Sequence, residues 1–392
     1  MEFVGIDIGT YKTTIASSKE NGKILVDEQG KRSIKSILEL TTPIRKFGNN
    51  ITGEHEQSIS LRHRPFTNNI NENTFFNTID DMKVDLMFFN YLNRIIKQNT
   101  TGNPSICLSV PSNYSNKDRR SIHQIAKLAN LKIERIFNQI SSIGMFAFLR
   151  RQLSDSKFVV IDFGHSKIEC GYFKIENFTF IPINIANIKI GAQNFDEKLI
   201  NIIFKKYKID DTKLNREIII RHLEKLKSIL NNSKTAAIPI YINDTSITIQ
   251  VTQEEFYIAC SDELSEIKSF LSDFLNEIDY KGNDNIEFTG GNSSVKFINN
   301  IFENVYNVQS TLDLTESGAI GSSLGLACTI INNKYKINDI IGRDIFVRVC
   351  KENEETNNKS LVFKKFDFTD NTKFITYNKK QVLKLNFWKT IH

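Results

Sequence analysis

One short motif occurs twice in the chain, and this repeat constrains the fold more than any other feature. The first copy, "FVGIDIGTYKTTIASS", spans residues 3–18, and the second, "VVIDFGHSKIECGYF", spans residues 159–173. Each copy is an apolar run, then Ile-Asp-x-Gly, then small and polar residues and an alternating segment. The offset from Asp7 to Asp162 is 155 residues (162 − 7). We expect each copy to form a strand, a tight turn and a second strand.

A similar order of elements follows each copy. After the first copy, the patterns predict helices over 80–98, 115–131 and 138–151 and strands over 105–110 and 132–137. After the second copy, they predict a strand segment over 178–191, helices over 194–207 and 216–231, a hairpin over 236–251, and a strand, Gly-Gly turn and helix over 285–302. Ser115 is a plausible N-cap, and Thr252 with Glu255 forms a capping box that should open one long helix.

The sequence therefore predicts an α/β fold with duplicated lobes around a shared cleft. We expect lobe I over 1–155, lobe II over 156–332 with its last helix returning to lobe I, and a short β-rich segment over 333–392.

Composition excludes several classes of function. The net charge is +6, and Lys and Arg alternate with Asp and Glu instead of clustering, so we expect no nucleic-acid partner. No run approaches the ~18 apolar residues of a membrane helix, and the N-terminus has no signal-peptide pattern, so we expect no membrane contact and a cytoplasmic location. The odd set of five cysteines lacks a CxxC pair, which favours buried thiols in a reducing compartment.

The repeated turn has the chemistry of an anion site. Gly9 and Gly164 allow backbone N–H groups to close around an anion. Asp7 and Asp162 would stand at the cleft from opposite lobes, where paired carboxylates beside phosphates suit hydrated Mg²⁺. Alone, each motif is more often an ordinary tight turn. The ordered set, with the "TGGN" segment at 289–292 as its third member, is more specific.

These residues resemble the actin and heat-shock protein 70 ATPase superfamily, over about residues 1–330. Within it, "LSVPSNYSNKDRRSIHQIAKLANLKIERIFNQISSIG", "IGAQNFDEKL", "EKLKSILN" and "TGGNSSVKFI" are similar to elements of the heat-shock branch. The resemblance implies an actin-like ATPase fold and ATP or ADP with Mg²⁺ as cofactors. It implies that the phosphates are contacted by Gly9, Thr10, Gly164, His165 and Ser166, and that Asp7 and Asp162 are the carboxylates that hold magnesium-bound water. It implies that the adenosine is contacted by Glu224, Lys227, Asn231, Gly290 and Gly291. Further cofactor contacts are implied for Tyr11, Gly191 and Asn292.

Three positions depart from the family pattern. Glu54 stands where the family has its catalytic lysine, Gln139 replaces the glutamate before Pro-Thr-Ala-Ala, and Lys167 replaces the threonine of the second phosphate loop. Because a lysine and a carboxylate are missing, we expect hydrolysis to be weak or absent. We still expect ATP to bind, because the turn N–H groups and the two Asp carboxylates remain. One hypothesis is that Lys167 supplies the missing cation; the alternative, which we favour, is a solvated lysine at a loop edge.

The segment after residue 332 is too short for a complete peptide-binding domain with a lid. Short strands are expected at "IFVRV", "LVFKKF", "KFITY" and "VLKLNFW". The "IDFGHS" motif and the tail layout resemble the heat-shock protein 110 relatives, which bind ATP and act as nucleotide exchange factors for heat-shock protein 70. The alternatives are a ribosome-associated, Ssz-type co-chaperone, with a J-domain protein or the ribosome as partner, and an active ATP-hydrolysing chaperone.

Overall fold

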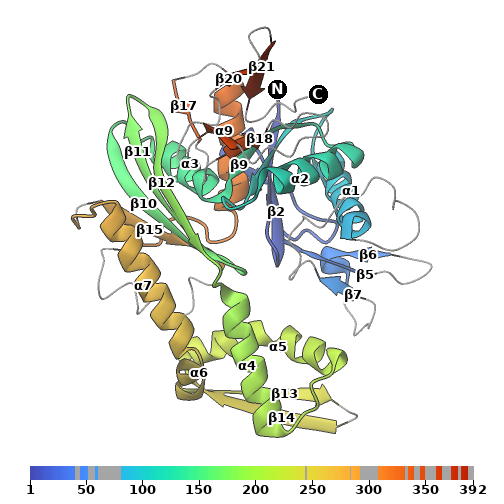
Figure 1. The fold of residues 1–392 in the computed structure, drawn as a ribbon. Helices are drawn as coiled ribbons and strands as arrows, with labels where there is room; N and C mark the ends of the chain where they lie inside the picture. Colours follow the sequence, from blue (N-terminus) through green and yellow to red (C-terminus); the bar gives the residue numbers. More distant parts are fainter. Residues whose placement is uncertain are drawn as a thin grey trace.

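The computed structural model describes residues 1–39, 45–51, 58–60, 81–242, 245–282, 284–291, 308–331, 334–339, 345–348, 359–363, 372–377 and 381–386. Glu54, Asn292 and the helix expected after Gly291 lie outside these ranges. The described residues form two six-stranded sheets with helices around them, and small two- and three-stranded sheets (Figure 1).

The first sheet has the pairing order β3-β2-β1-β8-β9, and β4 pairs with β2. Strand β1 is antiparallel to β2 and parallel to β8, and β8 is parallel to β9. Its strands are β1 (Phe3–Ile8), β2 (Lys12–Ser17), β3 (Lys23–Ile24), β4 (Ile34–Lys35), β8 (Ser105–Val110) and β9 (Ile133–Asn138). A small sheet beside it contains β5 (Ile37–Glu39), β6 (Lys46–Phe47) and β7 (Ser58–Ser60).

The second sheet repeats this arrangement. Its order is β16-β15-β10-β11-β12-β17, so β10, β11, β12, β15 and β16 stand where β1, β2, β3, β8 and β9 stand in the first sheet. The register also repeats, because Asp7 pairs with Thr14 and Asp162 pairs with Glu169. The strands are β10 (Ser156–Phe163), β11 (Ile168–Glu176), β12 (Thr179–Ile188), β15 (Asn285–Thr289), β16 (Val308–Gln309) and β17 (Lys336–Ile337).

Helices cover both sheets, and a further unit of helices and one hairpin extends from the second sheet (Figure 1). The helices are α1 (Asp81–Asn99), α2 (Asn116–Leu128), α3 (Gln139–Arg151), α4 (Ala192–Tyr207), α5 (Lys213–Asn232), α6 (Gln253–Ala259), α7 (Ser261–Glu277) and α9 (Ser317–Ile330). The hairpin consists of β13 (Thr235–Ile242) and β14 (Thr245–Thr252).

Two helix-capping signals expected from the sequence are confirmed, but the expected length of one helix is not. Ser115 caps α2, since its hydroxyl accepts a hydrogen bond from the Asp118 N–H. The capping box of Thr252 and Glu255 also forms. The expectation of one long helix after it is wrong, because the helical run is divided at Cys260 (φ −99°, ψ 5°) into the short α6 and the longer α7.

Two helices, α3 and α9, lie between the sheets and join them in one hydrophobic core. Their apolar side chains pack with residues from both sheets, among them Phe3 of β1 and Phe158 of β10. The two helix backbones nearly touch, because a Cβ atom on Gly321 would lie 1.8 Å from the carbonyl oxygen of Ser142. Helix α9 also approaches β1 closely, because a Cβ atom on Gly5 would lie 2.2 Å from the carbonyl oxygen of Ala319.

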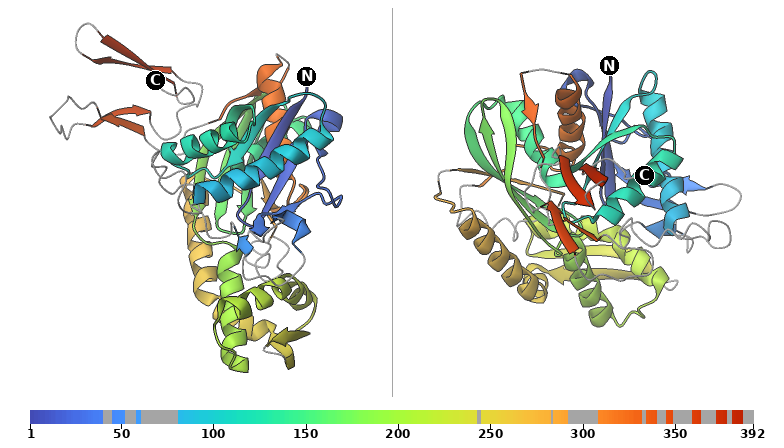
Figure 2. Two further views of the ribbon diagram at one scale, coloured as in Figure 1. Left: turned by 90° about the vertical axis from the view of Figure 1, so that its right-hand side faces the viewer. Right: turned by 45° about the horizontal axis from the view of Figure 1, so that its top comes forward.

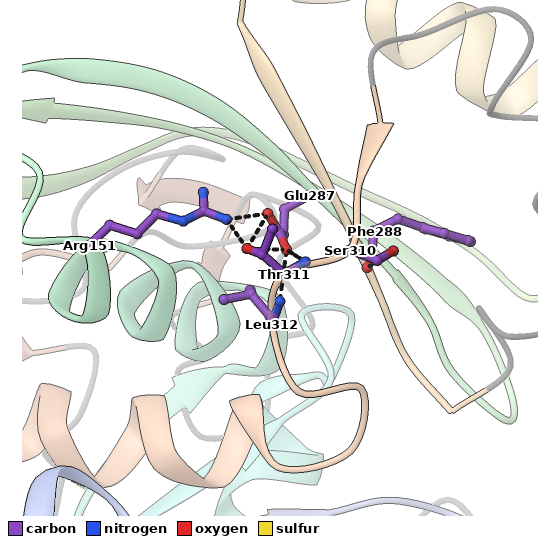
Figure 3. Close-up of polar contacts among 6 residues, drawn as sticks. All are labelled: Arg151, Glu287, Phe288, Ser310, Thr311 and Leu312. Atoms are coloured by element: carbon purple, nitrogen blue, oxygen red, sulfur yellow. Dashed lines mark hydrogen bonds and ion pairs between the residues drawn. The ribbon is translucent and has the colours of Figure 1, made fainter.

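A polar cluster at the C-terminal end of α3 ties the two halves together (Figure 3). Arg151 forms an ion pair with the buried carboxylate of Glu287 on β15. The same carboxylate accepts hydrogen bonds from the backbone N–H groups of Thr311 (2.5 Å) and Leu312 (2.9 Å), at the start of the segment that leads to α9. Burying this charge is tolerable because both oxygens have donors.

The β-rich tail forms two hairpins that lie to one side of the two sheets (Figure 2). They pair β18 (Ile345–Arg348) with β19 (Lys359–Phe363), and β20 (Thr372–Tyr377) with β21 (Gln381–Asn386), so the expected tail strands are confirmed. Near the start of the 333–392 segment, ahead of these hairpins, the buried carboxylate of Asp339 accepts hydrogen bonds from the backbone and side chain of Asn138 and from Ser141. This contact anchors the start of the tail at the N-terminus of α3.

Two further findings bear on the sequence analysis. The four described cysteines are free; Cys107, Cys170 and Cys260 are buried and Cys328 is half-buried. Across the part of the chain that the structure describes, no helix is both long enough and apolar enough to span a bilayer.

The close contact of α3 with α9 predicts that Gly321→Ala destabilises the protein. The added methyl would meet backbone, which cannot move aside, so the free energy of unfolding should fall by about 3 kcal/mol. Urea denaturation followed by circular dichroism measures this change. Gly325→Ala in the same helix is the control, because its Cβ would meet the flexible sulfur end of Met145 at 2.7 Å. Equal stability of the two variants would contradict the prediction.

Candidate functional site

A cavity of about 460 Å³ lies between the turns of the two repeated hairpins. It brings together nearly all the residues that the sequence singled out. The residues that line it include Asp7, Gly9, Thr10, Tyr11, Asp162, Gly164, His165, Ser166, Lys167, Glu224, Lys227, Asn231, Gly290 and Gly291. Gly191 does not line it, and Asn292 lies outside the described residues.

The two turns have the same backbone geometry. The N–H of Gly9 donates to the carbonyl of Lys12, and the N–H of Gly164 donates to that of Lys167, each at 3.0 Å. A Cβ atom on Gly9 would lie 2.5 Å from the Lys12 carbonyl oxygen, so a side chain there would break the turn. Gly9 is therefore needed for the first turn, whereas a Cβ atom on Gly164 would lie 3.0 Å from the Lys167 carbonyl oxygen, a tight but milder contact.

Two glycines outside the turns support the second hairpin. Gly191 caps α4, and a Cβ atom on it would lie 2.5 Å from the carbonyl oxygen of His165. Gly290 has a φ of +99°, and a Cβ atom on it would lie 2.4 Å from the carbonyl oxygen of Phe163. Gly191 thus packs behind the second turn, whereas Gly290 brings the β15 end against β10 at the cavity wall.

Asp7 and Asp162 bring two carboxyl groups to the cavity floor from the two sheets. Burial, together with the nearby negative charges of Glu169 and Asp7, raises the pKa of Asp162 to about 7. Burial likewise raises the pKa of Asp7 to about 6, although the positive charge of Lys167 opposes this shift. A Cβ atom on Gly318 of α9 would lie 2.5 Å from Asp7 Oδ2, so α9 also packs against the floor.

Lys167 lies inside the cavity wall, and the interpretation of it as a solvated lysine is wrong. The residue is 9% exposed, and its Nζ atom is 2.7 Å from Oε2 of the fully buried Glu169. Burial lowers the pKa of Lys167, while the charges of Glu169, Asp162 and Asp7 oppose the shift. The lysine therefore pairs with one buried carboxylate and feels the charge of two more, which a sequence reading of a loop edge could not show.

Gln139 lies at the floor as the family alignment placed it. Its Nε2 atom donates a weak hydrogen bond, 3.4 Å long, to Asp7 Oδ2. An amide has no ionisable proton, so this side chain can orient a carboxylate or a water molecule but cannot act as a general base.

The two hairpins contact each other at the mouth of the cavity. Thr10 Oγ1 and His165 Nδ1 are 3.2 Å apart, and the ring of Tyr11 stacks on that of His165 at 5.1 Å between centroids. Lys12 Nζ reaches across to Glu224 Oε1 of α5 at 3.1 Å. Burial raises the pKa of Glu224, but the charge and hydrogen bond of Lys12, with smaller contributions from Tyr11 and Lys227, together outweigh it and the net shift is downward.

Sequence reasoning missed several residues of the site. Asp196 of α4 forms an ion pair with Lys227 at 2.7 Å and lies 3.9 Å from His165 Nε2, so it fixes two predicted site residues. Asp196 belongs to the quoted "NFDEKL" motif, and Lys12 occupies the same step of the repeat as Lys167. The motif and the repeat offset were the signals that could have found them.

The donor set at the floor fits a hydrated divalent cation. Mg²⁺ usually keeps several waters and uses one or two carboxylates together with phosphate oxygens. Asp7 and Asp162 supply such carboxylates, and the upward pKa shift of each shows that a positive charge beside them would be favourable. The ammonium group of Lys167 supplies part of that charge.

Comparison with known proteins agrees with this geometry. The family model described as "Hsp70 protein" matches residues 67–376. The chain is 40% identical over 382 residues to a heat shock protein homolog of Encephalitozoon cuniculi, covering 97% of this chain and 56% of that protein. The chain therefore belongs to the Hsp70 family, whose ATPase part has the actin-like fold, and the predicted fold class is confirmed.

More distant relatives are heat shock proteins as well. The chain is 24% identical to the human heat shock 70 kDa protein 4L, over 73% of this chain and 37% of that protein. It is 25% identical to the heat shock protein hsp88 of Neurospora crassa, over 73% of this chain and 45% of that protein. The chain thus spans about half the length, or less, of these curated relatives. Members of the Hsp70 family bind nucleotide with Mg²⁺.

The raised pKa of Asp162 predicts a specific pH dependence of stability. The folded protein holds this proton up to about pH 7, whereas the unfolded chain releases it near the ordinary value of 3.8. Stability from this group is therefore present below pH 3.8 and is lost as the pH rises to about 7. Asn cannot ionise, so Asp162→Asn does not lose this stability as the pH rises. The free energy of unfolding of the variant minus that of the wild type should therefore increase by about 3 kcal/mol between pH 5 and pH 8.

Urea denaturation at several pH values, without nucleotide or metal, measures this difference. Asp273→Asn, at an exposed position of α7, is the control for loss of a surface carboxylate. A constant difference between Asp162→Asn and wild type across this range would contradict the prediction.

Proposed function

We propose that this chain is an ATP-binding co-chaperone of the Hsp70 family that acts as a nucleotide exchange factor for an Hsp70 partner and hydrolyses ATP weakly or not at all. The proposal that the chain binds a nucleotide rests on one observation: two equivalent Asp-x-Gly turns line the same cavity. A cytoplasmic location belongs to the same proposal.

The cavity divides by chemistry into two ends. At the end formed by the turns, backbone N–H groups, Thr10 and Ser166 suit the phosphates, and Asp7 with Asp162 would hold the water shell of Mg²⁺, which neutralises phosphate charge. At the other end, α5 contributes Glu224, Lys227, Ser228 and Asn231, and Gly290 with Gly291 leaves room for a flat base and ribose. We assign the adenosine to that end.

The floor supports binding better than hydrolysis. A general base must accept a proton from the attacking water, and Gln139 cannot do so. The Asp7 carboxylate beside it can hold water, but the lysine with which the family stabilises the transferring charge is replaced by Glu54 in the sequence. ATP would then act as a ligand that bridges the two hairpins and would not be a substrate for hydrolysis.

The partner is inferred from the branch of the family. The resemblance of "IDFGHS" to the heat-shock protein 110 relatives and the 40% identity to the heat shock protein homolog of Encephalitozoon cuniculi both favour an exchange factor for Hsp70. The Ssz-type role, with a J-domain protein or ribosome as partner, has no separate observation in its favour.

Calorimetric titration with ATP and ADP, followed by single-turnover hydrolysis, tests the nucleotide part. Ser228→Trp should weaken ATP binding at least about ten-fold, because an indole there would fill the adenosine end without entering the core. Lys225→Trp is the matched control, since that residue is exposed on the same helix but does not line the cavity. Turnover as fast as about 1 s⁻¹ would contradict the hydrolysis part.

Release of a fluorescent ADP analogue from a purified Hsp70 tests the exchange part. The chain with ATP should accelerate release, and Ser228→Trp should lose this effect while Lys225→Trp keeps it. No acceleration, together with co-sedimentation of the chain with ribosomes, would favour the Ssz-type alternative instead.

A further inference from the structure

The two hairpins place a lysine at the same step of the same turn. Lys12 and Lys167 are each five residues after the aspartate of their hairpin, and the backbone carbonyl of each accepts the hydrogen bond that closes the turn. The backbone of the repeat therefore delivers two cations to one cavity, and both line it.

The surroundings of the two lysines differ. The side chain of Lys12 is 38% exposed, and its partner Glu224 is 61% exposed, so this ion pair lies in water at the mouth. The side chain of Lys167 is 11% exposed, and its partner Glu169 is fully buried. In the first hairpin the position equivalent to Glu169 is Thr14, so the buried pair is present in one copy of the repeat.

Glu169 holds the ammonium group in place. One oxygen of its carboxylate accepts hydrogen bonds from the backbone N–H of Ser112 (2.9 Å) and from the Ser112 hydroxyl (2.5 Å). The other oxygen faces Lys167 at 2.7 Å. A carboxylate fixed on one side in this way fixes the cation on its other side, so Lys167 loses little further freedom when a ligand binds.

Besides its partner Glu169, the carboxyl groups of Asp7 and Asp162 act on this ammonium group, and the raised pKa of each reduces the negative charge that they carry near neutral pH. Lys12 and Lys227, which also line the cavity, are paired elsewhere, with Glu224 and Asp196. Of these three lysines, Lys167 is therefore the one at the carboxylate floor. A fixed ammonium in a low-dielectric site is an effective point charge for phosphate oxygens.

We propose that Lys167, held by Glu169, is a built-in cation of the cavity floor that takes over part of the phosphate neutralisation supplied by Mg²⁺, so that nucleotide binding depends only weakly on Mg²⁺. This inference rests on the proposed function, because it assumes that the cavity binds a nucleoside triphosphate. It assigns to Lys167 a binding role and requires no chemical step.

The test compares ATP affinity in Mg²⁺ and in excess EDTA by calorimetry, on the full chain. For the wild type, removing Mg²⁺ should weaken ATP binding by less than about ten-fold. For Lys167→Thr, the same removal should weaken binding at least about ten times more than it does in the wild type. Lys225→Thr is the control, because this lysine is exposed on α5 and does not line the cavity, and its ratio of the two affinities should equal that of the wild type.

A second variant keeps the test valid if Lys167→Thr fails to fold. Removing the lysine alone leaves Glu169 buried and unpaired, which destabilises a protein, whereas removing both charges of a buried pair is often tolerated. Lys167→Thr/Glu169→Thr places at 169 the residue type that the first hairpin has at Thr14. This double variant should show the same strong dependence on Mg²⁺, and thermal unfolding confirms that it is folded.

The outcomes separate this inference from the proposed function. A wild type that loses more than about a hundred-fold in affinity without Mg²⁺, or variants of Lys167 with the wild-type ratio, would overturn the inference alone. In that case the buried pair stabilises the fold only, and Mg²⁺ neutralises the phosphate charge of the nucleotide. Absence of ATP binding in both solutions would overturn the proposed function and this inference together.

Discussion

The contact between α3 and α9 is the constraint on which the rest of the structure depends. Gly321 lets the two helices approach until backbone meets backbone, and both helices pack between the two sheets. The N-terminus of α3 carries Gln139 to the cavity floor, and its C-terminus carries Arg151 to the buried Glu287. Helix α9 passes behind Asp7, where Gly318 leaves room for the carboxylate. The position of the floor therefore follows from how closely these two helices can pack.

The repeat supplies a common backbone, and the side chains give its two copies different tasks. Both turns close in the same way, and both aspartates pair with the neighbouring strand in the same register. The first copy has Thr14 where the second has Glu169, so a buried cation is stable in the second copy alone. A duplicated scaffold thus gives one half-buried lysine at the mouth and one buried lysine at the floor.

The sequence predicted most of what depends on local pattern. The repeated motif and its offset were sufficient for the duplicated lobes and for the residues of the two turns, whereas the resemblance to the heat-shock branch supplied the adenosine-side residues such as Glu224 and Lys227. What it could not predict depends on contacts between distant segments. Burial of Lys167 depends on Glu169 and on Ser112 of another segment, and the partner of Lys12 lies 212 residues away. The break at Cys260 also has no signal in the helical pattern, because the residues on both sides of it favour a helix.

The exposed ion pair of Lys12 with Glu224 has a consequence for how the cavity opens. This pair joins the first hairpin to α5 across the mouth, and both of its side chains are in contact with water. Dissolved ions screen such a pair strongly, whereas they have little effect on the buried pair of Lys167 with Glu169 or on the packed helices. Raising the ionic strength should therefore loosen the mouth before it loosens the floor, so that salt controls the rate of ligand entry and exit separately from the strength with which the floor holds the ligand.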